Sequence, residues 1–138
     1  MKTAIVIVFL IVSLSSCGHT IKKLPGDMEG KWSNTLPIEG TDGKVENEIT
    51  IAGDTLILKQ SFPRMSGIDK IKTTYIANRI EQDEDGIYSF YTSTENIKSR
   101  IVIHQIDAAL EISICQLNGE DNKDAQFTSC TELGSFAR

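Results

Sequence analysis

The stretch VENEITIAGDTLILKQSF, residues 45–62, carries the pattern that decides the fold. In its first half the apolar residues lie on one face of an extended chain: Val45, Ile49 and Ile51. The other face is polar: Glu46, Glu48 and Thr50. Such a period of two is typical of a half-buried β-strand. Gly53-Asp54 marks a turn, and Leu56, Leu58 and Phe62 repeat the pattern before Pro63 ends the run. The stretch predicts two antiparallel strands with one face toward a core.

The same pattern recurs along the rest of the chain, with turn residues between the runs. The expected strands are 29–35, 45–52, 55–62, 71–80, 87–92, 100–106, 109–117 and 125–133. Residues 93–100 have too few apolar positions for more than one helical turn. Short strands joined by short turns favour a closed sheet, which leaves no exposed edges. We therefore expect an all-β fold, a small antiparallel up-and-down β-barrel of about eight strands, with a β-sandwich as the alternative.

The side chains expected to point inward are bulky enough to fill a small barrel, although a barrel of this size can also hold one small ligand. They are Trp32, Ile49, Ile51, Leu56, Leu58, Phe62, Tyr75, Tyr91, Ile101, Ile103, Leu110, Ile112, Ile114 and Phe127.

The N-terminus has the pattern of an export signal. One lysine is followed by a short apolar run, residues 4–12, which is shorter than the roughly 20 residues of a spanning helix. Leu14-Ser15-Ser16-Cys17 then resembles a bacterial lipobox. The resemblance implies that residues 1–16 are a signal peptide, that Cys17 carries the lipid, and that acyl chains anchor the protein in a membrane. The alternatives are a soluble secreted protein cut nearby and a buried strand.

The predicted lipoprotein has a tether, residues 17–26, and a folded domain, residues 27–138. His19 is expected to be an exposed residue of the tether. Gly18, rather than an acidic residue, follows the lipidated cysteine, which favours the outer membrane, facing the periplasm, in an enteric-type envelope. The formal net charge of −5 argues against a nucleic-acid partner, which would need a basic footprint.

The two remaining cysteines are expected to form a disulfide. Cys115 and Cys130 both lie on the polar face of a predicted strand, and residues 118–124 between them have the composition of a turn. A hairpin would place the thiols opposite each other, and an exported protein is in an oxidising compartment. Two free thiols or a metal site are the alternatives, but the sequence nearby offers no further metal ligands.

The segment Asp27-Met28-Glu29-Gly30-Lys31-Trp32 resembles the first strand of lipocalin-like barrels, which carry Gly-x-Trp near the N-terminus. The resemblance implies that Trp32 closes one end of the barrel. It also implies that an arginine from the end of the last strand lies over the indole, and Arg138 is in place for this role.

The sequence offers little sign of catalysis. After the tether His104 is the only histidine, and it lies on the polar face of a predicted strand. Three adjacent acids, Asp83 to Asp85, begin like a calcium loop but lack the glutamate that would complete it. The segment GTDGK, residues 40–44, lacks the spacing of a phosphate-binding loop. We therefore expect no cofactor, no metal and no enzyme activity.

The remaining function classes are two kinds of binding. One is a lipocalin-like module for a small apolar or amphipathic molecule. The other is a protein-interaction lipoprotein: an inhibitor of a protease or cell-wall hydrolase, an immunity protein, or an envelope assembly accessory. The expected contact loops are 37–44, 63–70 and 81–86, and the acidic excess would suit a basic enzyme as partner.

Overall fold

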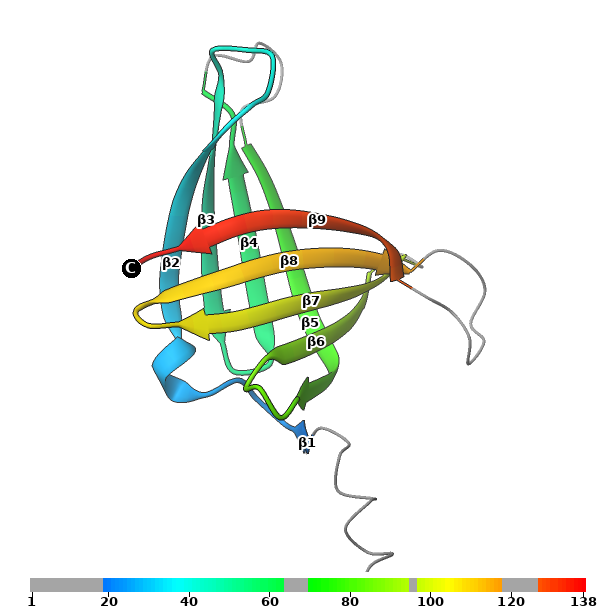
Figure 1. Cartoon of the computed structure of the whole chain (residues 1–138). Helices are drawn as coiled ribbons and strands as arrows, with labels where there is room; N and C mark the ends of the chain where they lie inside the picture. The colour runs from blue at the N-terminus through cyan, green and yellow to red at the C-terminus, as the bar shows by residue number, and fades with distance from the viewer. Residues whose placement is uncertain (1–18, 64–69, 95–96, 118–126) are drawn as a thin grey trace, which may run out of the picture.

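The computed structural model describes residues 19–63, 70–94, 97–117 and 127–138 (Figure 1). The strands are β1 (His19–Ile21), β2 (Gly30–Pro37), β3 (Lys44–Ala52), β4 (Thr55–Ser61), β5 (Lys70–Gln82), β6 (Tyr88–Thr94), β7 (Ile97–Ile106), β8 (Ala109–Leu117) and β9 (Phe127–Phe136). A single 3-10 turn, η3 (Gly26–Met28), precedes β2. No helix in the described part of the chain is long and apolar enough to cross a membrane.

The strands form an antiparallel up-and-down barrel. Each strand from β2 to β9 pairs with the next in the sequence. The circle is nearly closed by one bridge between β2 and β9, in which Ser33 and Ala137 exchange backbone hydrogen bonds of 2.8 and 3.0 Å. This confirms the barrel over the sandwich and is consistent with a small lipocalin-like fold.

The two halves of the barrel cross steeply, and β5 makes the corner between them (Figure 1). Residues 70–76 of β5 pair with β4, whereas residues 77–82 pair with β6, after a register shift between Ala77 and Arg79. β1 pairs with the last three residues of β5. A strand of this length can belong to both layers because the bulge bends it.

The hairpin predicted at residues 45–62 is present as β3 and β4. Ile49 faces Leu58 and Ile51 faces Leu56 across the ladder. Gly53 in the turn has a φ of +64°, which a residue without a Cβ adopts at little cost.

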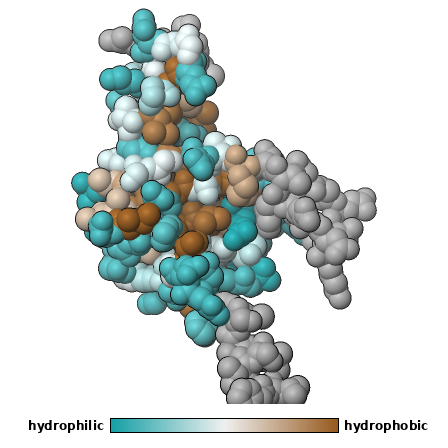
Figure 2. Space-filling view, in the orientation of Figure 1, coloured by the Kyte–Doolittle hydropathy of each residue, from teal (hydrophilic) through white to brown (hydrophobic). Residues whose placement is uncertain are grey.

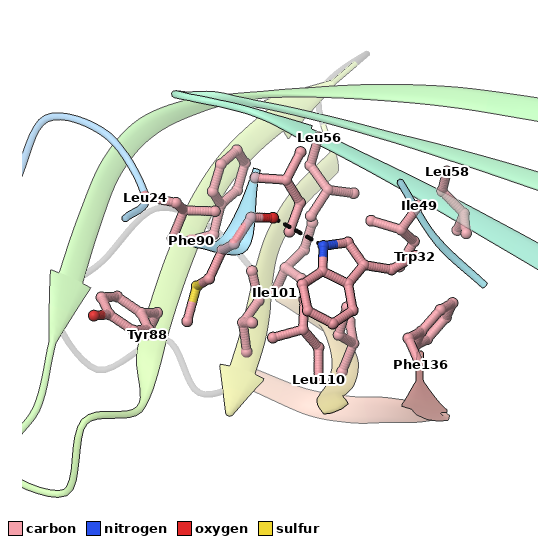
Figure 3. Close-up of a cluster of buried hydrophobic side chains, with 14 of the residues drawn as sticks. Leu24, Trp32, Ile49, Leu56, Leu58, Tyr88, Phe90, Ile101, Leu110 and Phe136 are labelled. Carbon is pink, nitrogen blue, oxygen red and sulfur yellow. Dashed lines mark hydrogen bonds between the residues drawn. The ribbon is translucent and has the colours of Figure 1, made fainter. Parts of the chain in front are cut away.

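The core fills the barrel between the two layers (Figure 3). Its largest side chains are exposed by 3% or less: Trp32, Ile49, Ile51, Leu56, Leu58, Ile80, Phe90, Ile101, Ile103, Leu110, Ile112 and Phe136. Tyr75 and Ile114 are half-buried against this cluster. The side chain of Phe127 lies outside the described residues.

The folded domain begins before residue 27, the predicted boundary. Two side chains differ from the prediction: Leu24, in the predicted tether, and Met28, which is not among the predicted inward residues. Leu24 and Met28 are 0% and 1% exposed, and both belong to the core cluster. His19, although exposed, begins β1, so the fold starts near residue 19 and not at residue 27. The polar composition of residues 17–26 predicted a tether. One apolar side chain in this segment, Leu24, is nevertheless enough to cover the end of the barrel.

One predicted inward residue, Tyr91, is wrong, and a second, Phe62, is only partly buried. Tyr91 points outward, where the Arg79 guanidinium carbon lies 4.3 Å from its ring centroid, and the inward residues of β6 are Tyr88 and Phe90. The segment IYSFYT has aromatic side chains on both faces of the strand, so its pattern does not show which face is buried. Phe62 follows the end of β4 and is only half-buried.

Two predicted element boundaries also change. Residues 93–94 and 97–100 are strand, not a helical turn. The last strand runs on to Phe136, because a register shift beside Gly134 lets it bend and continue.

The strands β2 to β5 extend beyond β9, and we call this extension the wing (residues 34–47, 60–62 and 70–71; Figure 1). Hydrophobic residues are visible on the part of the molecule that rises above β9 (Figure 2). The wing thus has an inner face that continues the barrel interior and an outer face that continues the barrel wall.

Candidate functional site

Trp32 lies within the buried cluster, near the start of β2 (Figure 3). The indole is 2% exposed, and its Nε1 donates a hydrogen bond of 2.9 Å to the backbone oxygen of Met28 in η3. Burying an indole requires a partner for its N–H. The 3-10 turn supplies it, so η3 and Trp32 close the end together.

Arg138 covers the outside of this seal. Its guanidinium carbon lies 4.5 Å from the centroid of the Trp32 ring, and its Nη2 donates to the backbone oxygen of Asp27. Gly30 has a φ of +112°, and a Cβ there would stand 3.4 Å from Nη1 of Arg138. Glycine at this position therefore gives both the backbone conformation and the room that the arginine needs. The structure places the three residues as the Gly-x-Trp resemblance implies.

A row of amides crosses the inner face where the wing begins. Asn47, 2% exposed, donates 2.9 Å to Oδ1 of Asn34 and accepts 3.1 Å from Nε2 of Gln60. Asn34 in turn donates 2.7 Å to the backbone oxygen of Leu133 in β9. Each buried polar atom thus has a partner. The row separates the dry core from the apolar residues of the wing, and the sequence analysis missed it.

The apolar residues above the amide row form a small open surface. Leu36 and Val45 are cross-strand partners and half-buried. Leu36 packs over β9, where a Cβ on Gly134 would lie 3.3 Å from its Cδ2. Ile71, the partner of Gln60 on β5, is 42% exposed.

The outer face of the same region holds a hollow of about 730 Å³. Four strands contribute to it, and its charged lining residues are Lys31, Glu46, Glu48, Lys59, Lys70 and Lys72. The hydroxyls of Ser33, Thr35 and Ser61 also line it, together with the three amides of the row and Ile71. The hollow is locally basic although the chain is acidic, since four lysines and two glutamates line it.

A second hollow, of about 320 Å³, lies on the outside of β7, β8 and β9. It contains His104 with Glu111 and Glu132. His104 is half-buried and faces Glu111 across the ladder. In the described part of the chain His104 makes no hydrogen bond to a hydroxyl or a carboxylate. No group of three metal-binding side chains occurs among the described residues either.

The acidic turn is built by its own carboxylate. Oδ1 of Asp83 accepts hydrogen bonds of 2.9 Å from the backbone N–H groups of Asp85 and Ile87. Asp83 is thus engaged in holding the turn, as asparagines and aspartates commonly are. Of the other predicted contact loops, 37–44 forms the tip of the wing, and residues 64–69 lie outside the described residues.

The predicted disulfide joins Cys115 and Cys130. The two residues are direct partners in the β8–β9 ladder, with Cα atoms 3.9 Å apart. Cys130 is exposed as predicted, but Cys115 is only 6% exposed, because the cross-strand bridge covers it. Cys17, the predicted lipid site, lies outside the described residues.

Two tyrosines of the barrel have shifted acidities. Burial raises the pKa of the Tyr88 phenol, and the negative charge of Asp27 raises it further. Burial also raises the pKa of Tyr75, although a hydrogen bond with Thr73 partly opposes the shift. Both groups therefore stay neutral well above physiological pH, and neither is suited to act as a base.

Comparisons with protein-family models and with curated proteins found no match to this chain.

Proposed function

We propose that this protein is a lipid-anchored, non-catalytic component of the bacterial cell envelope that binds a protein partner through its wing. The anchor is the lipobox cysteine, Cys17, which stands just before β1. The chain enters the fold at the closed end, where the backbone N–H of Leu24 donates a hydrogen bond to the backbone oxygen of the turn residue Gly53. The wing is at the opposite end (Figure 1), so it would point away from the anchoring membrane.

The filled interior supports binding outside the barrel. Trp32, Phe90 and Phe136 occupy the space that a ligand would need, and each is at most 2% exposed. The free apolar surface lies instead on the wing, at Leu36, Val45 and Ile71. Apolar side chains at the edge of a sheet are found where another chain packs.

The open edge of β5 is the observation that carries the proposal. Residues 70–75 pair with β4 on one side, and in the described part of the chain no strand pairs with them on the other. At Ile76 the edge ends, because its backbone oxygen accepts a hydrogen bond of 2.8 Å from the hydroxyl of Thr92 in β6, but its side chain is 59% exposed. An unpaired edge with apolar side chains is a template for an added strand from a partner. We therefore expect the partner to add an extended segment beside β5.

Site-specific photo-crosslinking in the expressing cell tests this function. A photoreactive phenylalanine analogue is placed at Ile71, and as a matched control at Asp107, an exposed residue of the β7–β8 turn away from the wing. We expect a discrete protein adduct from position 71 and none from position 107. The same adducts at both positions, or none at either, would rule out a partner on the wing.

The second candidate is a small apolar or amphipathic ligand, bound at the end of the barrel where the wing begins. The observation that favours it is the lipocalin-like closed end formed by Trp32 and Arg138, with an apolar surface above the amide row at the other end. Mass spectrometry of an organic extract of the purified protein distinguishes the two. A stoichiometric small molecule that is lost in the variant Leu36→Asp would favour this candidate over the protein partner.

A further inference from the structure

The hollow on the outer face of β2 to β5 has the chemistry of an anion site, and we propose that it binds a phosphate ester of a polyol or sugar. The inference does not need the proposed partner, because it uses only the lysine, serine and glutamate side chains of the hollow, although the two sites adjoin at residues 70–72 of β5. It rests on the position of the lysines, on the absence of an ion pair at Lys70 and Lys72 in the described residues, and on the order of charges across the strands.

Three lysines converge at one end of the hollow. Lys59 and Lys72 are direct cross-strand partners, and Lys70 lies two residues farther along β5 on the same face. Side chains directly opposite each other in an antiparallel pair have Cβ atoms about 5 Å apart, and like charges there destabilise the sheet. A multiply charged anion between the ammonium groups would remove this repulsion.

The positive charge at this end is largely uncompensated. The only ion pair in the described part of the hollow joins Nζ of Lys59 to Glu48, at 3.8 Å, and both side chains are more than a third exposed. A pair this long and exposed holds its members weakly. Lys70 and Lys72 have no ion pair in the described part of the chain. Their charges are therefore available to a ligand.

The order of side chains across the hollow orients that ligand. β3, in the middle, carries Glu46 and Glu48, which repel an anion. The anion is therefore confined to β4 and β5, beside the hydroxyl of Ser61, the cross-strand partner of Lys70. Over β2 and β3 the carboxylate of Glu46 faces Thr35 across the ladder, and together they offer acceptors and a donor for hydroxyl groups. A ligand with a phosphate at one end and hydroxyls at the other fits this order.

The kind of cation is compatible with phosphate. All four basic residues in the hollow are lysines, which bind phosphate as compact point charges. The phosphate ester could belong to a soluble molecule or to the headgroup of a lipid, since both carry the same phosphate and hydroxyl groups.

Titration calorimetry of the full chain in a non-ionic detergent tests the site, with glycerol 3-phosphate as the probe. We expect saturable binding of one molecule per chain, tighter than that of inorganic phosphate, and weaker when salt is raised from about 0.02 M to about 0.3 M. The double variant Lys70→Gln/Lys72→Gln should weaken binding at least about tenfold, since each charge-assisted contact contributes about that factor. The control Lys22→Gln/Lys44→Gln removes the same charge outside the hollow.

The outcomes separate the parts of the proposal. Absence of saturable binding, or equal weakening by the control variant, would overturn it. Equal affinity for inorganic phosphate would overturn the assignment of a polyol ester. Short-chain phosphatidic acid identifies the source: lysine-dependent binding tighter than that of glycerol 3-phosphate assigns the site to a lipid headgroup, and weaker binding assigns it to a soluble ester. Both of these results support the site.

Discussion

The guanidinium carbon of Arg138, the last residue of the chain, lies 4.5 Å from the ring centroid of Trp32, near its beginning. The contact joins the two ends of the barrel sheet, because β2 and β9 are otherwise linked mainly by the Ser33–Ala137 bridge. The same contact therefore links the burial of Trp32 to the closure of the sheet between β2 and β9. Arg138 is held here by the indole and by the backbone oxygen of Asp27.

Removing this cation should loosen the closed end. We expect Arg138→Ala to lower the free energy of unfolding by about 0.5–1 kcal/mol, which is the range of an exposed cation over an aromatic ring. Urea unfolding followed by the fluorescence of Trp32, the only tryptophan, measures it directly. Arg79→Ala is the matched control, since it removes a similar contact with Tyr91 on the exposed outer face. An equal or larger loss in the control would show that the seal adds nothing.

Breaking the disulfide should destabilise the barrel more strongly. The bridge joins residues 15 apart, and a loop of that length corresponds to about 3 kcal/mol in the chain-entropy treatment. The double variant Cys115→Ser/Cys130→Ser should therefore melt well below the parent protein in a calorimetric scan. Adding a reductant should lower the melting temperature of the parent and leave that of the variant unchanged. A parent protein insensitive to reductant would mean that the bridge does not stabilise the fold.

The amide row should be sensitive to loss of its central member. Asn47→Leu keeps the branched shape of the side chain but leaves Oδ1 of Asn34 and Nε2 of Gln60 without their partner, which costs about 1–3 kcal/mol. Chemical unfolding measures the change. Asn78→Ala, which breaks an exposed amide contact to Ser93, is expected to stay within about 0.5 kcal/mol. If the two variants behave alike, the row is not a structural element.

The stability of the fold should fall in alkaline solution because of Tyr88. Its pKa is raised in the folded state by burial and by Asp27, so the folded protein binds the phenolic proton more tightly than the unfolded chain does. The resulting stability is fully present below the unfolded pKa, about 10, and is lost as pH rises through the folded pKa. Tyr88→Phe should therefore flatten the decline of the melting temperature above about pH 10. A decline of unchanged slope would contradict the assignment to this residue.

Lipidation should depend on Cys17 alone. Cells fed with labelled palmitate should incorporate the label into the parent protein, which should sediment with membranes. The variant Cys17→Ala should lose both the label and the membrane association, whereas Cys115→Ser, which removes a different cysteine, should keep them. Label that persists in the Cys17 variant would exclude the lipobox assignment.

The strand pattern could be predicted because one face of each strand is buried. The alternation in residues 45–62 predicted β3, β4 and the turn between them, and the turn composition between Cys115 and Cys130 predicted their pairing. Tyr91 was misplaced because the aromatic residues of β6 occupy both faces, so the period of two is ambiguous there. Leu24 and Met28 could not be recognised as core, since a cap on a barrel end has no periodic pattern.

The candidate surfaces were harder to predict than the fold. Asn34, Asn47 and Gln60 occupy inward positions on three strands, and only the register brings them into one row. Likewise Lys59 and Lys72 each look like an ordinary solvated residue until the pairing of β4 with β5 places them opposite each other. These features arise from contacts between strands, which a single sequence does not encode locally.

The central claim is that a partner adds a strand to the open edge of β5, and hydrogen–deuterium exchange tests it most directly. The protein that is captured by the crosslink at position 71 is added to the full chain, and exchange is compared along β5. We predict slower exchange between residues 70 and 76, at the amides that do not donate to β4. Exchange at residues 77–82, which already pair with β6, should be unchanged. Protection centred on the closed end around Trp32, with β5 unaffected, would contradict it.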